Sequence, residues 1–333
     1  MTASSTPISW VSADVLLTGG GGFLGSWVAR VLHGRGVLPD QIAIPRRSQV
    51  DLCDRNTCEA FVKSFLETSS NPVVLHCAGL SGGLAMHKTR ASELYEVNRS
   101  LGHNLLDSLA KYASISKVPP VVVLVGHMTS YPADAPQPLR EASLGTGPLD
   151  PTTERLGTAK LEVLAHAKQL HEAVGLRSVM VIPTNLYGEG DALDDPARSH
   201  AAGAMMHRLM QAVQNHEPAI SHWGTGKAIR DFLHVEDAAR GVVAAANFAG
   251  RPEAFNLGSG VETTLRELSD VIANAAGYSG QVSWDATKPD GVPKRVLSIE
   301  KTTGTIGWKP QVSLLQGVAR TLAWYRSSRG WTM

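Results

Sequence analysis

Residues 15–25 read VLLTGGGGFLG, a short apolar run that passes into four glycines and then into a helical pattern. The glycine spacing allows a tight turn and lets the backbone approach a pyrophosphate at the N-terminus of a helix that we expect to begin near Phe23. A glycine-rich turn alone also fits a plain strand–helix connection, but the flanking strand and amphipathic helix favour a dinucleotide site. The predicted cofactor contacts in this turn are Gly19, Gly22, Phe23, Leu24 and Gly25.

The rest of the first half repeats this alternation of strand and helix. Short aliphatic runs, each expected to be a buried strand, occupy residues 15–19, 41–45, 72–79, 121–126 and 178–184. Amphipathic segments such as 98–113 lie between them. Continuous apolar strands that alternate with helices are typical of a parallel sheet covered on both faces. The sequence therefore predicts an α/β fold with a doubly wound parallel sheet.

The second half is less regular and richer in loops, among them the expected loop KPDGVPKR at 288–295. Ligands of such sheets bind beyond the carboxyl ends of the strands, where a smaller domain commonly completes the pocket. We expect residues 185–227 and 263–333 to form a partly interleaved substrate-binding cap domain, and residues 1–184 and 228–262 to form the cofactor-binding domain.

Charge and composition exclude several partner classes. The formal net charge is +1, so there is no electrostatic case for binding nucleic acid or an anionic membrane. The longest aliphatic run, residues 121–125, is far too short for a membrane span, and the start lacks the pattern of a signal peptide. Cys53, Cys58 and Cys77 form no C-x-x-C pair, which favours a reducing compartment and predicts a cytoplasmic protein. The 12 histidines include no H-E-x-x-H motif, so no metal site is expected.

The end of the second predicted strand indicates which dinucleotide binds. An NAD site usually places an acid there, but this segment reads IAIPRRSQVD, with Arg46 and Arg47 instead. Guanidinium groups suit a ribose 2′-phosphate, so NADP is favoured; the alternatives are NAD or a solvated basic loop without a ligand. The further expected cofactor contacts are Asp51 and Leu52 near the adenine, and Cys77, Ala78 and Gly79 along the dinucleotide.

Motifs along nearly the whole chain resemble the extended short-chain dehydrogenases, and within them the GDP-fucose synthase branch. They are TGxxGFxG at 18–25, a lysine at 160 in the Tyr-x-x-x-Lys position, PTNLYG at 183–188, WGTG at 223–226, RDFLHVEDAA at 230–239, FNLGSG at 255–260, KPDGVPKR, and IGWKPQVSLLQGVARTLAWY at 306–325. The resemblance implies a Rossmann-type fold, NADPH as cofactor, and a nucleotide sugar as substrate. Members of the branch epimerise and then reduce GDP-4-keto-6-deoxymannose. It also implies a homodimer formed through helices that begin near residues 92 and 152.

Three chemistry-bearing positions depart from that family pattern. Leu156 stands in place of the catalytic tyrosine, one helical turn before Lys160 and on the same helix face. In the strand-end motif GHMTSYP, His127 replaces a serine and Thr129 replaces the cysteine taken as the epimerisation base. Leucine cannot donate a proton, whereas an imidazole titrates near neutrality and can exchange a proton with a sugar oxygen. The predicted catalytic residues are His127, Thr129, Lys160 and His200, of which His200 matches the family's epimerisation acid.

The resemblance also assigns binding positions. Trp223 is expected to stack on a base or sugar, while Arg230, Lys288 and Lys294 are expected to meet phosphates, although each residue alone is more often a surface or packing residue. The predicted substrate contacts are Tyr131, Asn185, Arg208, Trp223, Arg230 and Lys288. The cofactor contacts that the resemblance adds are Lys160, Pro183, Asn185 and Leu186.

Three functions remain open on the sequence alone. The first is a nucleotide-sugar epimerase that acts next to an existing or transient keto group, with His200 as one acid/base and His127 or Thr129 opposite it. The second is an atypical dehydratase that oxidises a nucleotide sugar or nucleoside sugar, eliminates water and reduces it again. The third, from another class, is a non-catalytic NADP-binding homologue. Simple reductase activity ranks below all three unless His127 replaces the tyrosine.

Overall fold

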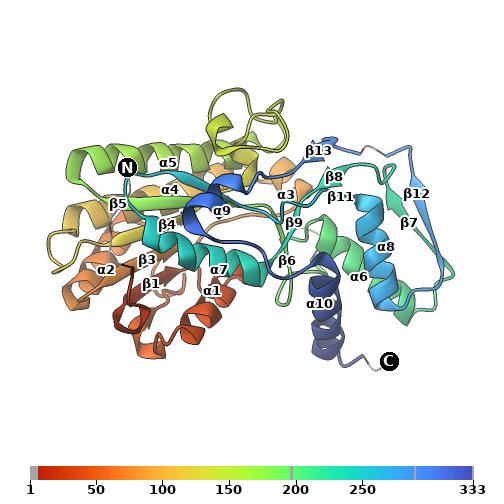
Figure 1. Cartoon of the computed structure of the whole chain (residues 1–333), viewed down its shortest axis with the longest axis horizontal. Coiled ribbons are helices and arrows are strands. Elements are labelled where there is room, and N and C mark those ends of the chain that lie inside the picture. The colour runs from red at the N-terminus through yellow and green to blue at the C-terminus, as the bar shows by residue number, and fades with distance from the viewer. Residues whose placement is uncertain (1–6, 196–197, 289, 332–333) are drawn as a thin grey trace.

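The computed structural model describes residues 7–195, 198–288 and 290–331. Its centre is a six-stranded sheet in the order β10-β5-β4-β3-β1-β2, with every neighbouring pair parallel (Figure 1). The strands are β1 (Asp14–Thr18), β2 (Ile42–Ala43), β3 (Pro72–His76), β4 (Val121–Val125), β5 (Arg177–Pro183) and β10 (Ala254–Leu257). The predicted doubly wound parallel sheet is thereby confirmed.

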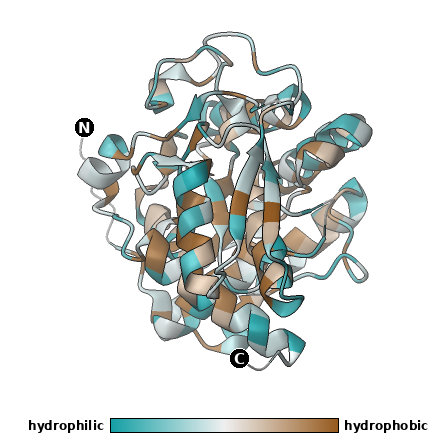
Figure 2. Cartoon of the chain, turned by 90° about the vertical axis from the view of Figure 1, so that its right-hand side faces the viewer, coloured by the Kyte–Doolittle hydropathy of each residue, from teal (hydrophilic) through white to brown (hydrophobic). Residues whose placement is uncertain are grey.

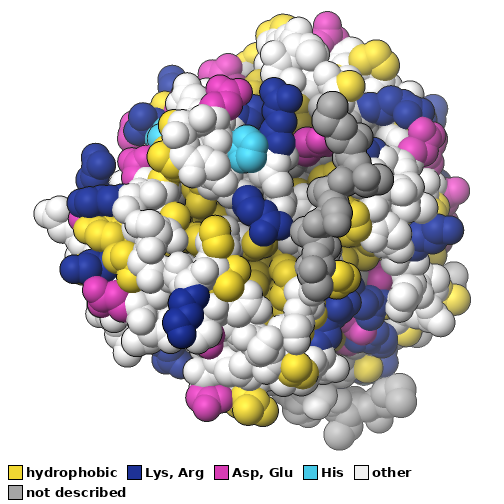
Figure 3. Space-filling model, turned by 60° about the vertical axis from the view of Figure 1, so that its left-hand side comes forward, with side chains coloured by type: hydrophobic (Ala, Val, Ile, Leu, Met, Phe, Trp, Pro, Cys, Tyr) yellow, Lys and Arg dark blue, Asp and Glu magenta, His cyan; other side chains and the backbone are white. Residues whose placement is uncertain are grey.

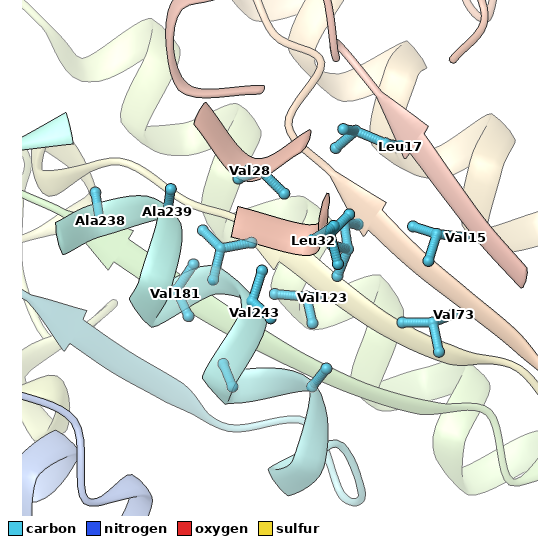
Figure 4. Close-up of a cluster of buried hydrophobic side chains, with 14 of the residues drawn as sticks. Val15, Leu17, Val28, Leu32, Val73, Val123, Val181, Ala238, Ala239 and Val243 are labelled. Carbon is cyan, nitrogen blue, oxygen red and sulfur yellow. The ribbon is translucent and has the colours of Figure 1, made fainter. Parts of the chain in front are cut away.

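Helices cover both faces of this sheet because its strands are apolar on both sides. Val15 and Leu17 of β1 pack against one helix layer, while Leu16 between them packs against the other. The first layer is α1 (Phe23–Gly34) and α7 (Val235–Ala245), and the second is α2 (Arg55–Thr68), α4 (Ala91–Tyr112) and α5 (Glu154–Val174). Figure 4 shows the first layer, where Val28 and Leu32 of α1 meet strand valines and α7 alanines. Each fully buried aliphatic side chain contributes about 1.5–3 kcal/mol.

The remaining elements form a second core beside the carboxyl end of the sheet, at the right of Figure 1. Its helices are α6 (Ala201–Gln214), α8 (Leu265–Ala276) and α10 (Leu314–Arg329). Its strand pairs are β7 (Ala219–Trp223) with β12 (Gln281–Asp285), and β8 (Ile229–Arg230) with β11 (Thr263–Thr264) and β13 (Lys294–Arg295). The strands β6 (Asn185–Tyr187) and β9 (Phe232–His234) pair with each other and contribute residues to both cores. The short helix α3 (Leu84–Thr89) packs on α4, and α9 (Glu300–Ile306) packs on β10.

Local sequence signals fix several helix ends. The Asp54 side chain accepts a hydrogen bond from Thr57 N at the start of α2, and capping boxes begin α8 and α10. Gly175, at φ +72°, ends α5 in the left-handed conformation that glycine tolerates. Figure 2 shows that the strands and the inward helix faces carry the apolar residues, while hydrophilic residues face outward. On the face seen in Figure 3, positive and negative side chains are interspersed.

Two sequence predictions differ from the structure in detail. The predicted strand at 41–45 is only the two residues Ile42–Ala43; Pro45 has no N–H to pair with a neighbouring strand, and a turn follows at residues 47–49, where Gln49 N and Val50 N donate to Arg46 O. The predicted loop 288–295 ends in a strand, since Lys294 and Arg295 pair in parallel with Ile229 and Arg230. No helix among the described residues is long and apolar enough to cross a membrane.

Candidate active site

The glycine-rich turn between β1 and α1 has the geometry that a dinucleotide requires. Gly19 has φ +71°, and Gly22 N donates to Gly19 O at 2.9 Å just before α1 begins. A Cβ on Gly25 would lie 2.1 Å from Gly19 O, so only glycine lets the helix approach the turn this closely. The first-turn N–H groups of α1 are therefore presented at the turn, where they suit a pyrophosphate.

The segment after β2 contributes exposed positive charge. Arg46 and Arg47 are both exposed on the loop that follows the strand. Asp51 is half-buried, and its carboxylate accepts a hydrogen bond from Cys53 N at 3.0 Å, while Leu52 is buried. Two exposed guanidinium groups on this loop have the chemistry that suits a ribose 2′-phosphate.

The loop after β3 brings the cofactor turn next to Lys160. A Cβ on Gly19 would lie 2.5 Å from Ala78 N, and a Cβ on Gly79 would lie 3.5 Å from Lys160 Nζ. A Gly79 side chain would also clash with Asn98 Oδ1, a buried acceptor without a partner among the described residues. The loop of residues 77–79 therefore lies between the glycine turn and Lys160.

Lys160 is 8% exposed and makes no hydrogen bond to any described residue. Burial lowers its pKa to about 8, and the nearby Cys77 opposes this shift only partly. The amine therefore remains largely protonated at neutral pH and can give up its proton at modest cost. Leu156, fully buried one turn earlier on α5, contributes only apolar surface to this side of the site.

His127 stands at the end of β4 and is held by its own turn. Its Nδ1 accepts from Thr129 N at 3.3 Å and lies 2.9 Å from Thr129 Oγ1. An Nδ1 that accepts leaves the ring proton on Nε2, which makes no hydrogen bond to a described residue. Burial first, and then His200, His87 and Lys160, lower the pKa of His127 to about 3. His127 is therefore a neutral hydrogen-bond donor, and the Thr129 hydroxyl is engaged with it.

Two further histidines influence His127 electrostatically. His200 is the residue before the first turn of α6, and burial and then His87 lower its pKa. His87, on α3, is 7% exposed, and burial lowers its pKa while the Asp150 carboxylate opposes this shift. The sequence analysis missed His87 because α3 is too short to show a helical period, and its closeness to His127 comes from the fold.

A pair of arginines lies at the second core. Arg230 of β8 pairs with Arg295 of β13 on the neighbouring parallel strand. Burial lowers the pKa of both guanidinium groups. Arg295 is 8% exposed, and its Nη1 is buried without a hydrogen-bond partner among the described residues. Asp150 favours the charged form of Arg295 as it does that of His87. An enclosed guanidinium with a free donor is suited to an anionic ligand.

The other predicted substrate residues fall in different surroundings. Trp223 is 74% exposed, with Lys288 Nζ 5.9 Å from the centre of its ring, so an aromatic surface and a cation stand together. Arg208 instead makes a two-pronged ion pair with Glu217 at 2.7 and 2.9 Å. Tyr131 is fully buried, and its hydroxyl donates to Asn256 Oδ1 at 2.6 Å, which places it in the core rather than beside a substrate.

Three of the predicted contact residues lie at the end of β5 and in β6. Pro183 is the last residue of β5, and the Asn185 amide donates to Asp231 O at 2.9 Å. Leu186 packs partly buried against the first helix layer. Among the described residues no group of three or more His, Cys, Asp or Glu side chains has the arrangement of a metal site.

Comparison with known proteins agrees with this fold. A model of the NAD dependent epimerase/dehydratase family matches residues 15–258, and the chain belongs to this family. It is 32% identical over 314 residues to the putative GDP-L-fucose synthase 2 of Arabidopsis thaliana, covering 94% of this chain and 92% of that protein. It is 30% identical over 320 residues to the GDP-L-fucose synthase of Escherichia coli, covering 93% and 96% respectively.

A solved structure extends the comparison. The GDP-L-fucose synthetase of Naegleria fowleri bound to NADP superposes with a TM-score of 0.80 at 22% identity, covering 98% of each chain, which shows a shared fold. The resemblance to the extended short-chain dehydrogenases is therefore confirmed, and the chain is an enzyme of this type, from a nucleotide-sugar-modifying family.

Proposed function

We propose that this enzyme binds NADP and epimerises a nucleotide sugar at a carbon next to a keto group, without net transfer of hydride. One observation carries the proposal: Lys160 lies beside the loop of residues 77–79, yet Leu156 occupies the position of the proton donor, and His127 is influenced electrostatically by Lys160 and by two further histidines. A ketone reductase needs a donor to the carbonyl oxygen at the moment of hydride transfer, whereas an epimerase needs acid/base groups at the neighbouring carbon.

The cofactor assignment rests on the glycine turn and on charge. The close approach at Gly25 forms the cradle for a pyrophosphate, and Arg46 and Arg47 favour NADP over NAD. The Naegleria fowleri protein of the same fold is described with NADP. Where the keto group is transient, the bound dinucleotide would accept a hydride as the keto group is made and return it as the keto group is removed.

The chain's own residues fit the proton chemistry. The C–H bond next to the carbonyl breaks, its proton passes to a base, and its electron pair moves towards the carbonyl oxygen as an enolate forms. The His127 Nε2–H and the Lys160 ammonium are the donors suited to hold that oxygen. Because burial keeps His200 neutral near pH 7, it suits proton removal on one face, and once protonated it can return a proton. Thr129 acts through His127 by fixing the ring.

The substrate proposal draws on the second core. Arg230 and Arg295 are suited to a diphosphate, and Trp223 with Lys288 to a base at the exposed end. The curated relatives are named GDP-L-fucose synthases, so a GDP-sugar is the first substrate to test. On this proposal residues 185–227 and 263–333 form the substrate-binding cap, and residues 1–184 and 228–262 bind the cofactor.

The assembly and compartment are also part of the proposal. A groove on α4 and α5 is lined by Tyr95, Glu96, Arg99, His103, Glu162, Ala165, His166 and Gln169. In it the His103 and His166 rings stack 4.3 Å apart, and His103 Nε2 is buried without a partner among the described residues. We expect a second copy of the chain to cover this face. The three free cysteines are consistent with the cytoplasm.

The test is incubation with GDP-4-keto-6-deoxymannose in deuterated water, with and without NADPH, followed by product mass and proton NMR. Deuterium uptake and a new epimer without oxidation of NADPH are expected. His200→Ala should lose epimer formation by about 10²–10⁴-fold, while His33→Gln, an exposed histidine at the end of α1, should not. NADPH oxidation at the rate of epimer formation would make the chain a reductase, and loss of a water mass would make it a dehydratase.

A further inference from the structure

An epimerase needs acid/base groups on both faces of the reacting carbon, and only one face has been assigned such a group. The inference that follows rests on the proposed function. Inversion at a carbon needs one group to remove a proton from one face and another to supply a proton to the opposite face. His200 serves one face. Thr129 has its hydroxyl engaged by His127 Nδ1, and His127 accepts through that same nitrogen, so neither offers a free second base.

His87 is a further titratable residue at this edge of the sheet. The helix α3 that carries it follows β3, and the turn of His127 follows β4, the neighbouring parallel strand. The carboxyl ends of parallel strands open at the same edge, so both segments lie at that edge, and His87 is near enough to His127 to lower its pKa. The His87 ring makes no hydrogen bond to any described residue, and neither of its nitrogens is fully enclosed, although the residue is only 7% exposed.

The electrostatic neighbours of His87 come from three other elements. They are His127 at the end of β4, His200 at the start of α6, and Asp150 in the loop before α5. The Asp150 carboxylate favours the charged form of His87 and raises its pKa against the effect of burial, while His87 itself lowers the pKa of His127 and of His200. His87 is thus the histidine of the three with a carboxylate to support its protonated form.

We propose that His87 is the second acid/base residue, which acts on the opposite face of the epimerised carbon from His200. One histidine takes the proton as the enolate forms, and the other, already protonated, gives its own proton to the same carbon. The C–H bond that breaks is replaced by one on the other face, and exchange with solvent restores both rings. No oxidant or reductant is consumed in this step.

The test compares His87→Gln, His87→Ala and Asp150→Asn with the wild-type protein on GDP-4-keto-6-deoxymannose in deuterated water. His87→Gln should lower epimer formation by about 10²-fold or more while NADPH binds unchanged. Added imidazole should restore part of the activity of His87→Ala. Asn in place of Asp150 retains an acceptor for Thr152 N, so the turn persists, and the limb of the pH–rate profile assigned to His87 should move to lower pH. His33→Gln is the matched control.

The outcomes separate the two proposals. If the wild-type protein forms no epimer, the proposed function and the role of His87 both fall. If the wild-type forms epimer and His87→Gln does so equally well, His87 is not an acid/base residue and the proposed function stands. His87 would have only a packing role if two results coincided. The first is that imidazole fails to restore the activity of His87→Ala, and the second is that the pH–rate profile of Asp150→Asn is the same as that of the wild-type protein. If His87→Ala fails to fold, His87→Gln and Asp150→Asn decide.

Discussion

At the scale of single residues, Leu156 distinguishes this site from a ketone reductase. The side chain is fully buried, one turn from a lysine whose ammonium lies beside the cofactor loop. The lysine of the family motif is therefore retained, while the group that would protonate a reduced carbonyl is absent at that position. This explanation can be tested by replacing Leu156 with a residue that carries a hydroxyl group.

Leu156→Tyr should create NADPH-dependent reduction of GDP-4-keto-6-deoxymannose, with a gain of about 10²-fold or more, because a phenol next to Lys160 can protonate the oxygen. The larger ring costs about 1–3 kcal/mol of stability in a closed site. NADPH oxidation measured at 340 nm follows the gain. Leu156→Phe has the ring without the hydroxyl, so equal rates in the two variants would refute the explanation.

His76 links the site to stability. It is 2% exposed with Nδ1 2.7 Å from Thr18 Oγ1, and burial, then Lys160, lower its pKa to about 3. The unfolded chain binds the proton below about pH 6.5, whereas the folded chain resists it until much lower pH. Stability is therefore lost as the pH falls from about 6.5 towards 3, by about 2 kcal/mol at pH 5.

His76→Gln should remove this part of the pH dependence while it keeps a side chain able to bond Thr18. Urea unfolding gives the free energy of unfolding at pH 8 and at pH 5. The difference between these two free energies should be about 2 kcal/mol smaller in the variant than in the wild-type protein. An unchanged difference would mean that His76 is not the titrating group.

At the scale of elements, features that depend on local sequence are predictable, whereas features that depend on contacts between distant segments are not. The buried strands are recognisable because strands covered on both faces read as unbroken apolar runs, and the glycine turn is recognisable because its steric demands act within a few residues. The strand formed by Lys294 and Arg295 was predicted as a loop, since two residues carry no period and the strand exists only through pairing with β8. His87 and Arg295 became functional candidates only when distant segments met.

Gly25→Ala tests the junction of β1 and α1. The added Cβ would lie 2.1 Å from Gly19 O, so the helix must move away from the turn. We expect a loss of about 1–3 kcal/mol in stability, and NADPH affinity that falls by roughly 10- to 100-fold if the same energy is lost on binding. Thermal unfolding and fluorescence titration measure these effects. Gly34 is the control, because a Cβ added at this far end of the same helix would have no neighbour within 4 Å. Gly34→Ala should lower neither the stability nor the affinity for NADPH.

At the scale of the whole molecule, the groove on α4 and α5 predicts the assembly. A dimer of this 35.5 kDa chain should sediment at about twice that mass. Tyr95→Arg combined with His103→Arg should give a monomer, because like charges are then added to both sides of a two-fold interface. Arg35→Glu, on an exposed turn after α1, is the control. A wild-type monomer at micromolar concentration would refute the prediction.

The strand order of the central sheet has a consequence for synthesis of the chain. β10 closes the sheet beside β5, yet its residues follow those of β5 by about 70 positions and come after α6, β7 and α7. While a ribosome makes this intervening stretch, the edge of β5 has no partner, and an unpaired apolar edge is a template for association with other chains. Chains truncated between β5 and β10 should therefore aggregate, and chaperone capture should be greatest over that interval of translation.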